Sequence, residues 1–152
     1  MAQIYRAMRA DGDSPMVGHT KNDTLGVREG VDIQPIEDVV QPSTGGMSVS
    51  PSLQELPPHL IPKRLRTHGY PAARRSNNLP ETFPWRMGAG SFTDGQLCDR
   101  LQLRLDPSDP AHGFVEPDRP MSLEEYRAAI EATRTDWVRE EWWKEEGHDS
   151  HK

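Results

Sequence analysis

The sequence predicts an α+β fold: a single small domain with a mixed or antiparallel β core and one capped helix near the C-terminus. Three segments, at residues 3–9, 47–50 and 112–116, have the composition of short strands. Fourteen prolines and twelve glycines favour short elements joined by turns. Helical spacing is clear only after Ser122, so the helix is expected to follow the strands.

In the first third of the chain, residues 3–9 predict a strand that ends at Asp11-Gly12-Asp13. Residues 25–36 are weakly strand-like. The sequence Gln41-Pro42-Ser43-Thr44-Gly45-Gly46 predicts a turn, and residues 47–50 predict the strand that leaves it. The first two strands are therefore separated by a long polar connection.

The middle of the chain is less regular. Pro57 and Pro58 make residues 53–61 extended or turn-like rather than a long helix. The sequence of residues 62–95 does not predict a defined helix or strand. Residues 97–105 predict a half-buried strand, because Leu101, Leu103 and Leu105 share one face. After a turn rich in Asp and Pro, residues 112–116 predict another strand, which stops at Pro117.

The predicted helix begins with a capping box, formed by Ser122 and Glu125. Apolar residues then recur in steps of three and four, at Leu123, Tyr126, Ile130, Thr133 and Trp137. We expect the helix to run from about Leu123 to Glu145, with Trp142 and Trp143 extending its apolar surface. The folded domain is expected to cover residues 1–147, followed by a flexible tail at 148–152.

Composition limits the class of protein. A single cysteine, Cys98, excludes an intramolecular disulfide and a multi-cysteine zinc site, and it favours a reducing compartment. The N-terminus lacks the apolar run of a secretory signal, and no segment approaches the roughly 20 apolar residues of a membrane helix. We therefore expect a cytoplasmic protein with no membrane partner, which would need a specialised system for any delivery into other cells.

The net charge of −6 conceals a basic stretch between residues 61 and 87, which has six basic side chains and one acidic. These cations, from Lys63 to Arg86, suit a phosphate, a nucleic acid or an acidic partner. A solvated surface loop explains the same pattern. The charge pattern alone leaves both interpretations open.

Three groups of residues are candidates for chemistry. Tyr5-Arg6 lies in the first strand, where a buried guanidinium would need an anionic partner such as a phosphate. Gly45 and Gly46 would let the backbone approach a ligand, and Ser48 and Ser50 share the next strand face and could bind a ribose or an amide. An exposed edge arginine and an ordinary turn are the alternatives.

The third group is His112, Phe114 and Glu116, which fall on one face of the last predicted strand. A histidine and a carboxylate beside an aromatic ring could position and polarise a ribose or a nicotinamide. A solvated strand end is the alternative. The chain contains no common motif for a metal or for a nucleotide phosphate, so no metal is expected.

Several segments, taken in order, point to a known family. They are Ile4-Tyr5-Arg6-Ala7, Leu25-Gly26-Val27, Asp32-Ile33, Thr44-Gly45-Gly46-Met47-Ser48-Val49, and the spacing His112-x4-Pro117-x2-Pro120-Met121, followed by a helix with tryptophans. This ordered set resembles the antibacterial type VI secretion effector toxins with the ADP-ribosyltransferase fold. The segments span nearly the whole chain, except for residues 63–100.

The resemblance implies a β core of ADP-ribosyltransferase type and a toxin that uses NAD as a substrate, without a metal. Arg6 would then clasp the pyrophosphate of NAD, and Ser48 would hold the nicotinamide ribose or amide. His112 or Glu116 would act beside that ribose, with His112 the better match to the family. A cognate immunity protein or antitoxin is the expected partner, and the cellular target is a protein or a nucleic acid.

Two other functions fit the sequence. One is a toxin on the same fold that hydrolyses NAD, with water as the acceptor. The other is a non-enzymatic binding module that uses the basic segment at residues 63–86. NAD binding separates both NAD-dependent activities from the binding module.

Overall fold

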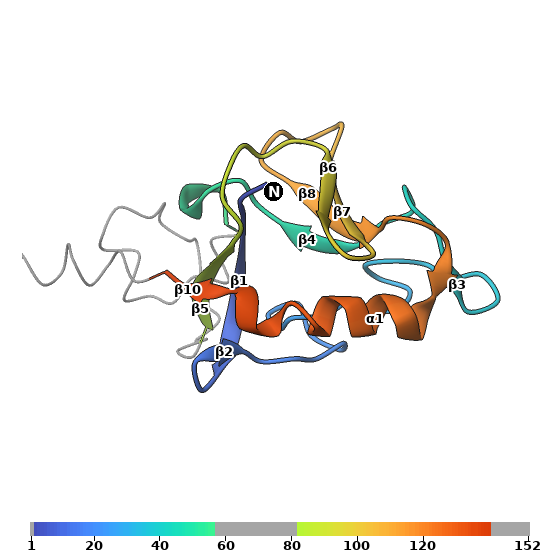
Figure 1. Ribbon diagram of the computed structural model, residues 1–152, viewed down its shortest axis with the longest axis horizontal. Coiled ribbons are helices and arrows are strands. Elements are labelled where there is room, and N and C mark those ends of the chain that lie inside the picture. The colour runs from blue at the N-terminus through green and yellow to red at the C-terminus, as the bar shows by residue number, and fades with distance from the viewer. Residues whose placement is uncertain (1, 57–81, 141–152) are drawn as a thin grey trace, which may run out of the picture.

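The computed structural model describes residues 2–56 and 82–140, in which antiparallel strands form two four-stranded sheets. Figure 1 shows both sheets. The first sheet has the order β10-β5-β1-β2, with bounds Val138–Arg139, Thr82–Met87, Ile4–Asp11 and Ser14–Pro15. The second has the order β4-β8-β7-β6, with bounds Met47–Val49, Gly113–Pro117, Leu101–Leu105 and Gly95–Cys98. The architecture is α+β, as predicted.

Among the described residues there is one α-helix, α1 (Leu123–Glu131). It runs along the lower side of the molecule in Figure 1, with β4, β8, β7 and β6 above it. A short pair, β3 (Val39–Val40) with β9 (Met121–Ser122), leads into it. Two 3-10 turns, Leu53–Glu55 and Arg134–Asp136, complete the described elements. The core between α1 and the sheets is built mainly from aliphatic and aromatic side chains, among them Leu101, Leu103, Val115, Tyr126 and Ile130.

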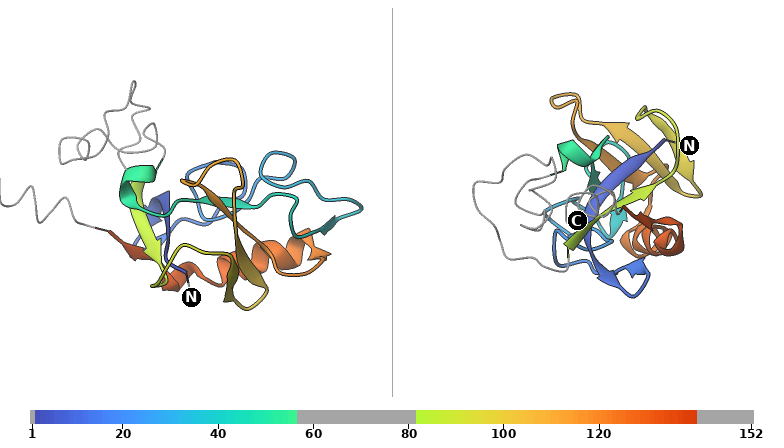
Figure 2. Two further views of the ribbon diagram at one scale, coloured as in Figure 1. Left: turned by 90° about the horizontal axis from the view of Figure 1, so that it is seen from above. Right: turned by 90° about the vertical axis from the view of Figure 1, so that its left-hand side faces the viewer.

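A single backbone bridge joins the two sheets. The Tyr5 N–H donates to the Ser50 carbonyl and the Ser50 N–H donates to the Tyr5 carbonyl, both at 2.9 Å. Figure 2 shows β1 and β4 from two further directions. Beyond this bridge β1 continues as the partner of β5, whereas β4 pairs with β8. The two strands therefore separate after one shared pair, and we call this place the strand fork.

The predicted first strand, the strand after the glycine turn and the strand before Pro117 are confirmed as β1, β4 and β8. The weak strand at residues 25–36 is wrong. The backbone there makes only isolated bridges, and Val31, Asp32 and Ile33 turn back to donate to the Arg28 carbonyl. A tight turn replaces the strand because these N–H groups are satisfied locally.

The predicted strand at residues 97–105 is two strands, β6 and β7, joined at Asp99 and Arg100. Arg100 adopts a positive φ of 72°, which reverses the chain, and its carbonyl accepts from the Asp118 N–H. The leucine alternation is confirmed within β7, where Leu101 and Leu103 are buried. The apolar residues at 97–105 therefore belong to the two strands of a hairpin, and their spacing did not reveal the turn between them.

The capping box is confirmed, because the Ser122 hydroxyl accepts from the Glu125 N–H at 3.0 Å and the Glu125 carboxylate accepts in return. The predicted end near Glu145 is wrong, since α1 ends at Glu131. Thr133 donates its hydroxyl to the Ile130 carbonyl and accepts from the Trp137 indole, which turns the chain into β10 at the edge of β5. Residues 141–152, with Trp142, Trp143 and the predicted tail, lie outside the described residues.

Tyr126 fastens α1 to the second sheet. Its fully buried hydroxyl donates to the Val115 carbonyl and accepts from the Met47 N–H, so it ties β8 and β4 to the helix. Burial raises the pKa of this phenol, which stays protonated and able to donate. Gly46 leaves the room that the hydroxyl needs, because a Cβ there would lie 3.2 Å from it.

We expect Tyr126→Phe to lower the free energy of unfolding by about 1–3 kcal/mol, because it leaves the Met47 N–H and the Val115 carbonyl without this partner. Urea denaturation of the variant and the wild type measures the difference. Tyr5→Phe is the matched control, because the Tyr5 hydroxyl makes no hydrogen bond to the part of the chain that the structure describes. Equal midpoints for Tyr126→Phe and the wild type would contradict this role.

Candidate functional site

The strand fork contains a pocket of about 220 Å³. Residues 5–7 of β1 form one wall and residues 48–50 form the opposite wall, since the two segments pair only at Tyr5 and Ser50 and then separate. Five residues that the sequence singled out line it, namely Tyr5, Arg6, Ser48, Ser50 and His112. Arg28, Asp32 and Asn22 complete its polar lining. The fold thus brings together positions that are more than one hundred residues apart.

Arg6 is buried in the strand fork, with 7% of its surface exposed. Its guanidinium donates to the Ser48 carbonyl at 2.6 Å, to the Thr24 carbonyl at 2.9 and 3.1 Å, and to the Asn22 carbonyl at 3.4 Å. Burial lowers its pKa to about 10, which leaves it protonated at neutral pH. The anionic partner expected from the sequence is thus replaced by backbone carbonyls, and Arg6 holds β1 to β4 and to the 22–24 loop.

The two serines differ in what their hydroxyls do. Ser50 is buried and donates to the Glu55 carbonyl at 3.2 Å, so its hydroxyl is already used. Ser48 is half-buried on the pocket wall, and its hydroxyl has no partner within residues 2–56 and 82–140. Of the two, Ser48 is therefore the residue that can bind a ligand.

The predicted role of Gly45 and Gly46 needs correction, because they approach the protein's own backbone and not the pocket. Gly45 has φ of 126°, and a Cβ there would lie 2.2 Å from the Asp32 carbonyl oxygen. A Cβ at Gly46 would lie 2.5 Å from the Val115 carbonyl oxygen, and the Gly46 N–H donates to the Asp32 carbonyl at 2.8 Å. The glycines therefore seat Asp32 beside β4.

Asp32 and Arg28 form a bidentate ion pair on the pocket wall. The Arg28 Nε and Nη2 each lie 3.1 Å from an Asp32 carboxylate oxygen, and the Arg28 backbone N–H donates to the same group at 2.7 Å. In the sequence, Asp32 belongs to one of the segments that carry the resemblance, and no pattern marks Asp32 or Arg28 as a site residue. Their spacing of four in a loop with Gly30 was the available signal, but it does not show that the loop reaches the strand fork.

His112 lies on the pocket wall just before β8, and its ring is fixed on two sides. Nδ1 lies 2.8 Å from an Asp106 carboxylate oxygen, and the ring meets Phe114 edge to face with centroids 4.6 Å apart. In the sequence, Asp106 reads only as part of a turn. The Asp106–His112 pair is the second feature of the candidate site that the sequence did not reveal.

Glu116 is not part of the pocket, which corrects its candidacy as a catalytic residue. It is only 1% exposed, and its carboxylate accepts from the Ser43 N–H at 2.8 Å, from Arg104 Nε at 2.8 Å and from Gln102 Nε2 at 2.6 Å. Two of these donors come from β7 and one from the 41–46 turn, so Glu116 ties β8 to both. A carboxylate with this many internal donors serves the fold.

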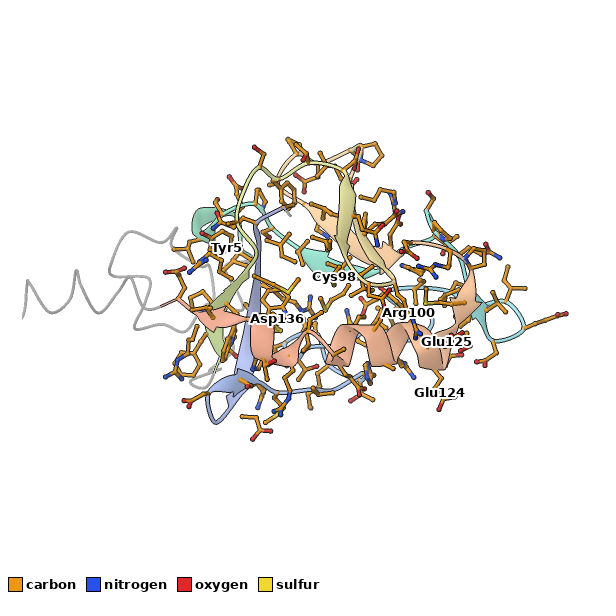
Figure 3. The ribbon with its side chains drawn as sticks, in the orientation of Figure 1. Tyr5, Cys98, Arg100, Glu124, Glu125 and Asp136 are labelled. Carbon is orange, nitrogen blue, oxygen red and sulfur yellow. The ribbon has the colours of Figure 1, made fainter. Side chains whose placement is uncertain are left out.

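A second pocket of about 410 Å³ lies between the β6–β7 turn and α1. Figure 3 labels Cys98, Arg100 and Asp136, which line this second pocket, and Tyr5, which lines the pocket at the strand fork. Burial raises the pKa of the Cys98 thiol, and the nearby carboxylates raise it further. A thiol in this state is a poor nucleophile, so the second pocket offers weaker chemistry than the strand fork.

We expect Arg6→Ala to lower the free energy of unfolding by about 2–4 kcal/mol, because the carbonyls of Ser48, Thr24 and Asn22 lose a charged donor. Urea denaturation measures this loss. Arg119→Ala, whose side chain is exposed and bound to the adjacent Asp118, is the control and should change stability little. An unchanged midpoint for Arg6→Ala would mean that Arg6 is free to serve a ligand instead.

The described residues contain no group of three or more histidines, cysteines or carboxylates that could hold a metal ion. Within the same ranges, no helix combines the length and apolar character needed to cross a membrane. Comparison with protein-family models, curated proteins and solved structures gave no match.

Proposed function

We propose that this protein is an NAD-dependent toxin that transfers ADP-ribose to a target inside bacterial cells. The main support is the convergence of Tyr5, Arg6, Ser48, Ser50 and His112 on one pocket at the strand fork. These residues come from three segments that lie far apart in the sequence. The same three segments belong to the ordered set that carries the resemblance to ADP-ribosyltransferase toxins.

The pocket suits one end of NAD. Its volume of about 220 Å³ is smaller than the roughly 300–1,000 Å³ of a typical small-molecule site, so the nicotinamide and its ribose would enter and the remainder would lie outside. The free Ser48 hydroxyl can hold a ribose hydroxyl or the amide. Arg28 is the better contact for the pyrophosphate, because Arg6 already donates to carbonyls and the Arg28 side chain is 31% exposed.

Loss of nicotinamide leaves positive charge on the ribose, which a carboxylate can stabilise. Glu116 was the candidate for this role, but it lies outside the pocket. Asp32 is the only carboxylate on the pocket wall among the described residues. We assign the electrostatic role to Asp32, held in place by Arg28 and by the glycine turn.

The alternative of a binding module on residues 63–86 gains no support from the described residues. Arg86 is paired with Glu140 at 2.9 Å across β5 and β10. Lys63, Arg64, Arg66, Arg74 and Arg75 lie outside the described residues. Hydrolysis of NAD by water in the same pocket is the other alternative, and product analysis distinguishes it from transfer.

We expect NAD to raise the melting temperature of the purified protein, because a ligand at about 100 times its Kd stabilises the folded state by about 2.7 kcal/mol. Thermal unfolding with and without NAD measures this. Release of nicotinamide together with ADP-ribose on cell protein or nucleic acid, found by mass spectrometry, would show transfer. Free ADP-ribose alone would show hydrolysis, and no melting shift at millimolar NAD would contradict both activities.

We expect the wild-type protein to arrest bacterial growth on expression, and Ser48→Ala to abolish this toxicity at near-native stability. The Ser48 hydroxyl makes no bond in the described fold, so its removal should cost the fold little. Ser91→Ala is the matched control and should remain toxic, because Ser91 is exposed and does not line the pocket. Growth assays at equal soluble expression decide the matter.

Toxicity also predicts a partner, since a cell that makes the toxin needs protection from it. A cognate immunity protein or antitoxin that covers the strand fork would block NAD entry. Normal growth at high expression of soluble wild-type protein would contradict the toxin proposal. Continued arrest by Ser48→Ala would exclude Ser48 from the site.

A further inference from the structure

Asp106 and His112 close a small loop by two contacts. The Asp106 N–H donates to the His112 carbonyl at 3.0 Å, and the Asp106 carboxylate lies 2.8 Å from His112 Nδ1. The other carboxylate oxygen accepts from the Ser108 N–H at 2.9 Å and from its hydroxyl at 2.8 Å. The carboxylate therefore has a fixed position and faces the imidazole.

The environment keeps Asp106 charged. Its hydrogen bond with His112 is the largest influence that lowers its pKa, and together with Ser108 it holds the pKa at about 2. An ionised carboxylate only accepts hydrogen bonds, so Nδ1 of His112 must donate to it. In the neutral ring, Nε2 then has no proton and can accept one.

The ring cannot easily turn away from this position. Phe114 meets it at an interplanar angle of 73°, and the Arg104 guanidinium lies over Phe114 at 4.6 Å from the ring centroid. Nδ1 is occupied by Asp106, whereas Nε2 has no partner in the part of the chain that the structure describes. Since His112 lines the pocket, Nε2 is its one available chemical group.

We infer that Asp106 is a positioning residue that makes His112 the proton acceptor of the pocket, an inference that rests on the proposed use of NAD. The acceptor nucleophile, such as a hydroxyl or water, attacks the ribose carbon that carries nicotinamide. A new bond forms from the nucleophile oxygen to that carbon, and nicotinamide leaves as a neutral molecule with the electron pair of the broken bond. The proton of the nucleophile passes to His112 Nε2.

Other ionisable groups share the pocket with this imidazole. Those on the pocket walls are Tyr5 and Arg6 from β1 and Arg28 and Asp32 from the 28–33 turn, and Arg104 faces the ring through Phe114. The two charges of Arg28 and Asp32 are paired with each other, and Arg6 donates to carbonyls. Asp106 is the only charged group among the described residues that is hydrogen-bonded to His112.

The test measures NAD hydrolysis by the purified full chain at several pH values between 5 and 9. The rate of nicotinamide release is the readout. A reaction that needs an unprotonated base should be faster at the high-pH end of this range than at the low-pH end. Asp106→Asn preserves an acceptor for Ser108 but offers an amide N–H to Nδ1, which moves the ring proton to Nε2. We expect its kcat to fall by roughly 100-fold, with the pH-dependent rise lost and the KM for NAD within about twofold of wild type.

Asp106→Glu should restore part of the rate, because it restores an acceptor for Nδ1. Asp109→Asn is the matched control: it removes a carboxylate from the same loop but keeps the oxygen that accepts from the Ala111 N–H. Its rate and pH profile should match wild type. An Asp106→Asn variant that behaves like Asp109→Asn would overturn the inference.

Nitrogen-15 NMR of the wild-type protein with labelled histidines tests the inference without any substitution. It should show the neutral His112 ring protonated at Nδ1, and protonation at Nε2 would overturn the inference even if NAD is consumed. Wild-type protein that neither binds NAD nor releases nicotinamide would overturn the proposed function, and the proton-accepting role with it. Turnover by wild type with an unaffected Asp106→Asn variant would overturn only the role of Asp106.

Discussion

The rest of the structure depends on the guanidinium of Arg6 between two separating strands. β1 and β4 share only the Tyr5–Ser50 pair, and beyond it a continued ladder would close the space that is now the pocket. Arg6 occupies one side of that space and donates to carbonyls of β4 and of the 22–24 loop. One cation therefore links β1 to β4 and to the 22–24 loop at the place where the two strands no longer pair. The burial that lowers the pKa of Arg6 still leaves it charged at neutral pH, so the arrangement persists under ordinary conditions.

Around this centre the polar side chains divide by whether their bonding capacity is used. Glu116 accepts from three donors and Ser50 donates to Glu55, so both have internal partners. Ser48, Arg28 and His112 border the same pocket and each keeps capacity for a ligand. This division explains why His112 and Glu116, which were predicted to share one strand face, differ in whether they can meet a ligand. His112 precedes β8 and reaches the pocket, whereas Glu116 is enclosed by β7 and the 41–46 turn.

Features governed by neighbouring residues could be predicted from the sequence. The strands at β1, β4 and β8 and the capping box of α1 follow from local alternation, turn residues and spacing. Features governed by distant contacts could not. The end of α1 at Glu131 depends on Trp137 and on pairing of β10 with β5, and the seating of the glycines depends on Asp32 and Val115. The site residues could be chosen by chemistry, but Asp106 and Asp32 were not singled out because each acts through a loop whose direction the sequence does not specify.

The same contacts determine which substitutions can separate folding from function. Arg6 lines the pocket and also supports it, so the loss of activity in an Arg6 variant has two explanations. Gly45 and Gly46 carry the same ambiguity, because a side chain there would push Asp32 or Val115 away from β4. Ser48 and Asp106 do not carry this ambiguity. The Ser48 hydroxyl has no partner among the described residues, and Asp106 lies in an exposed loop whose turn an asparagine can still cap. The decisive tests of a ligand in the strand fork therefore lie at its least supporting residues, where a change in chemistry leaves the two sheets in place.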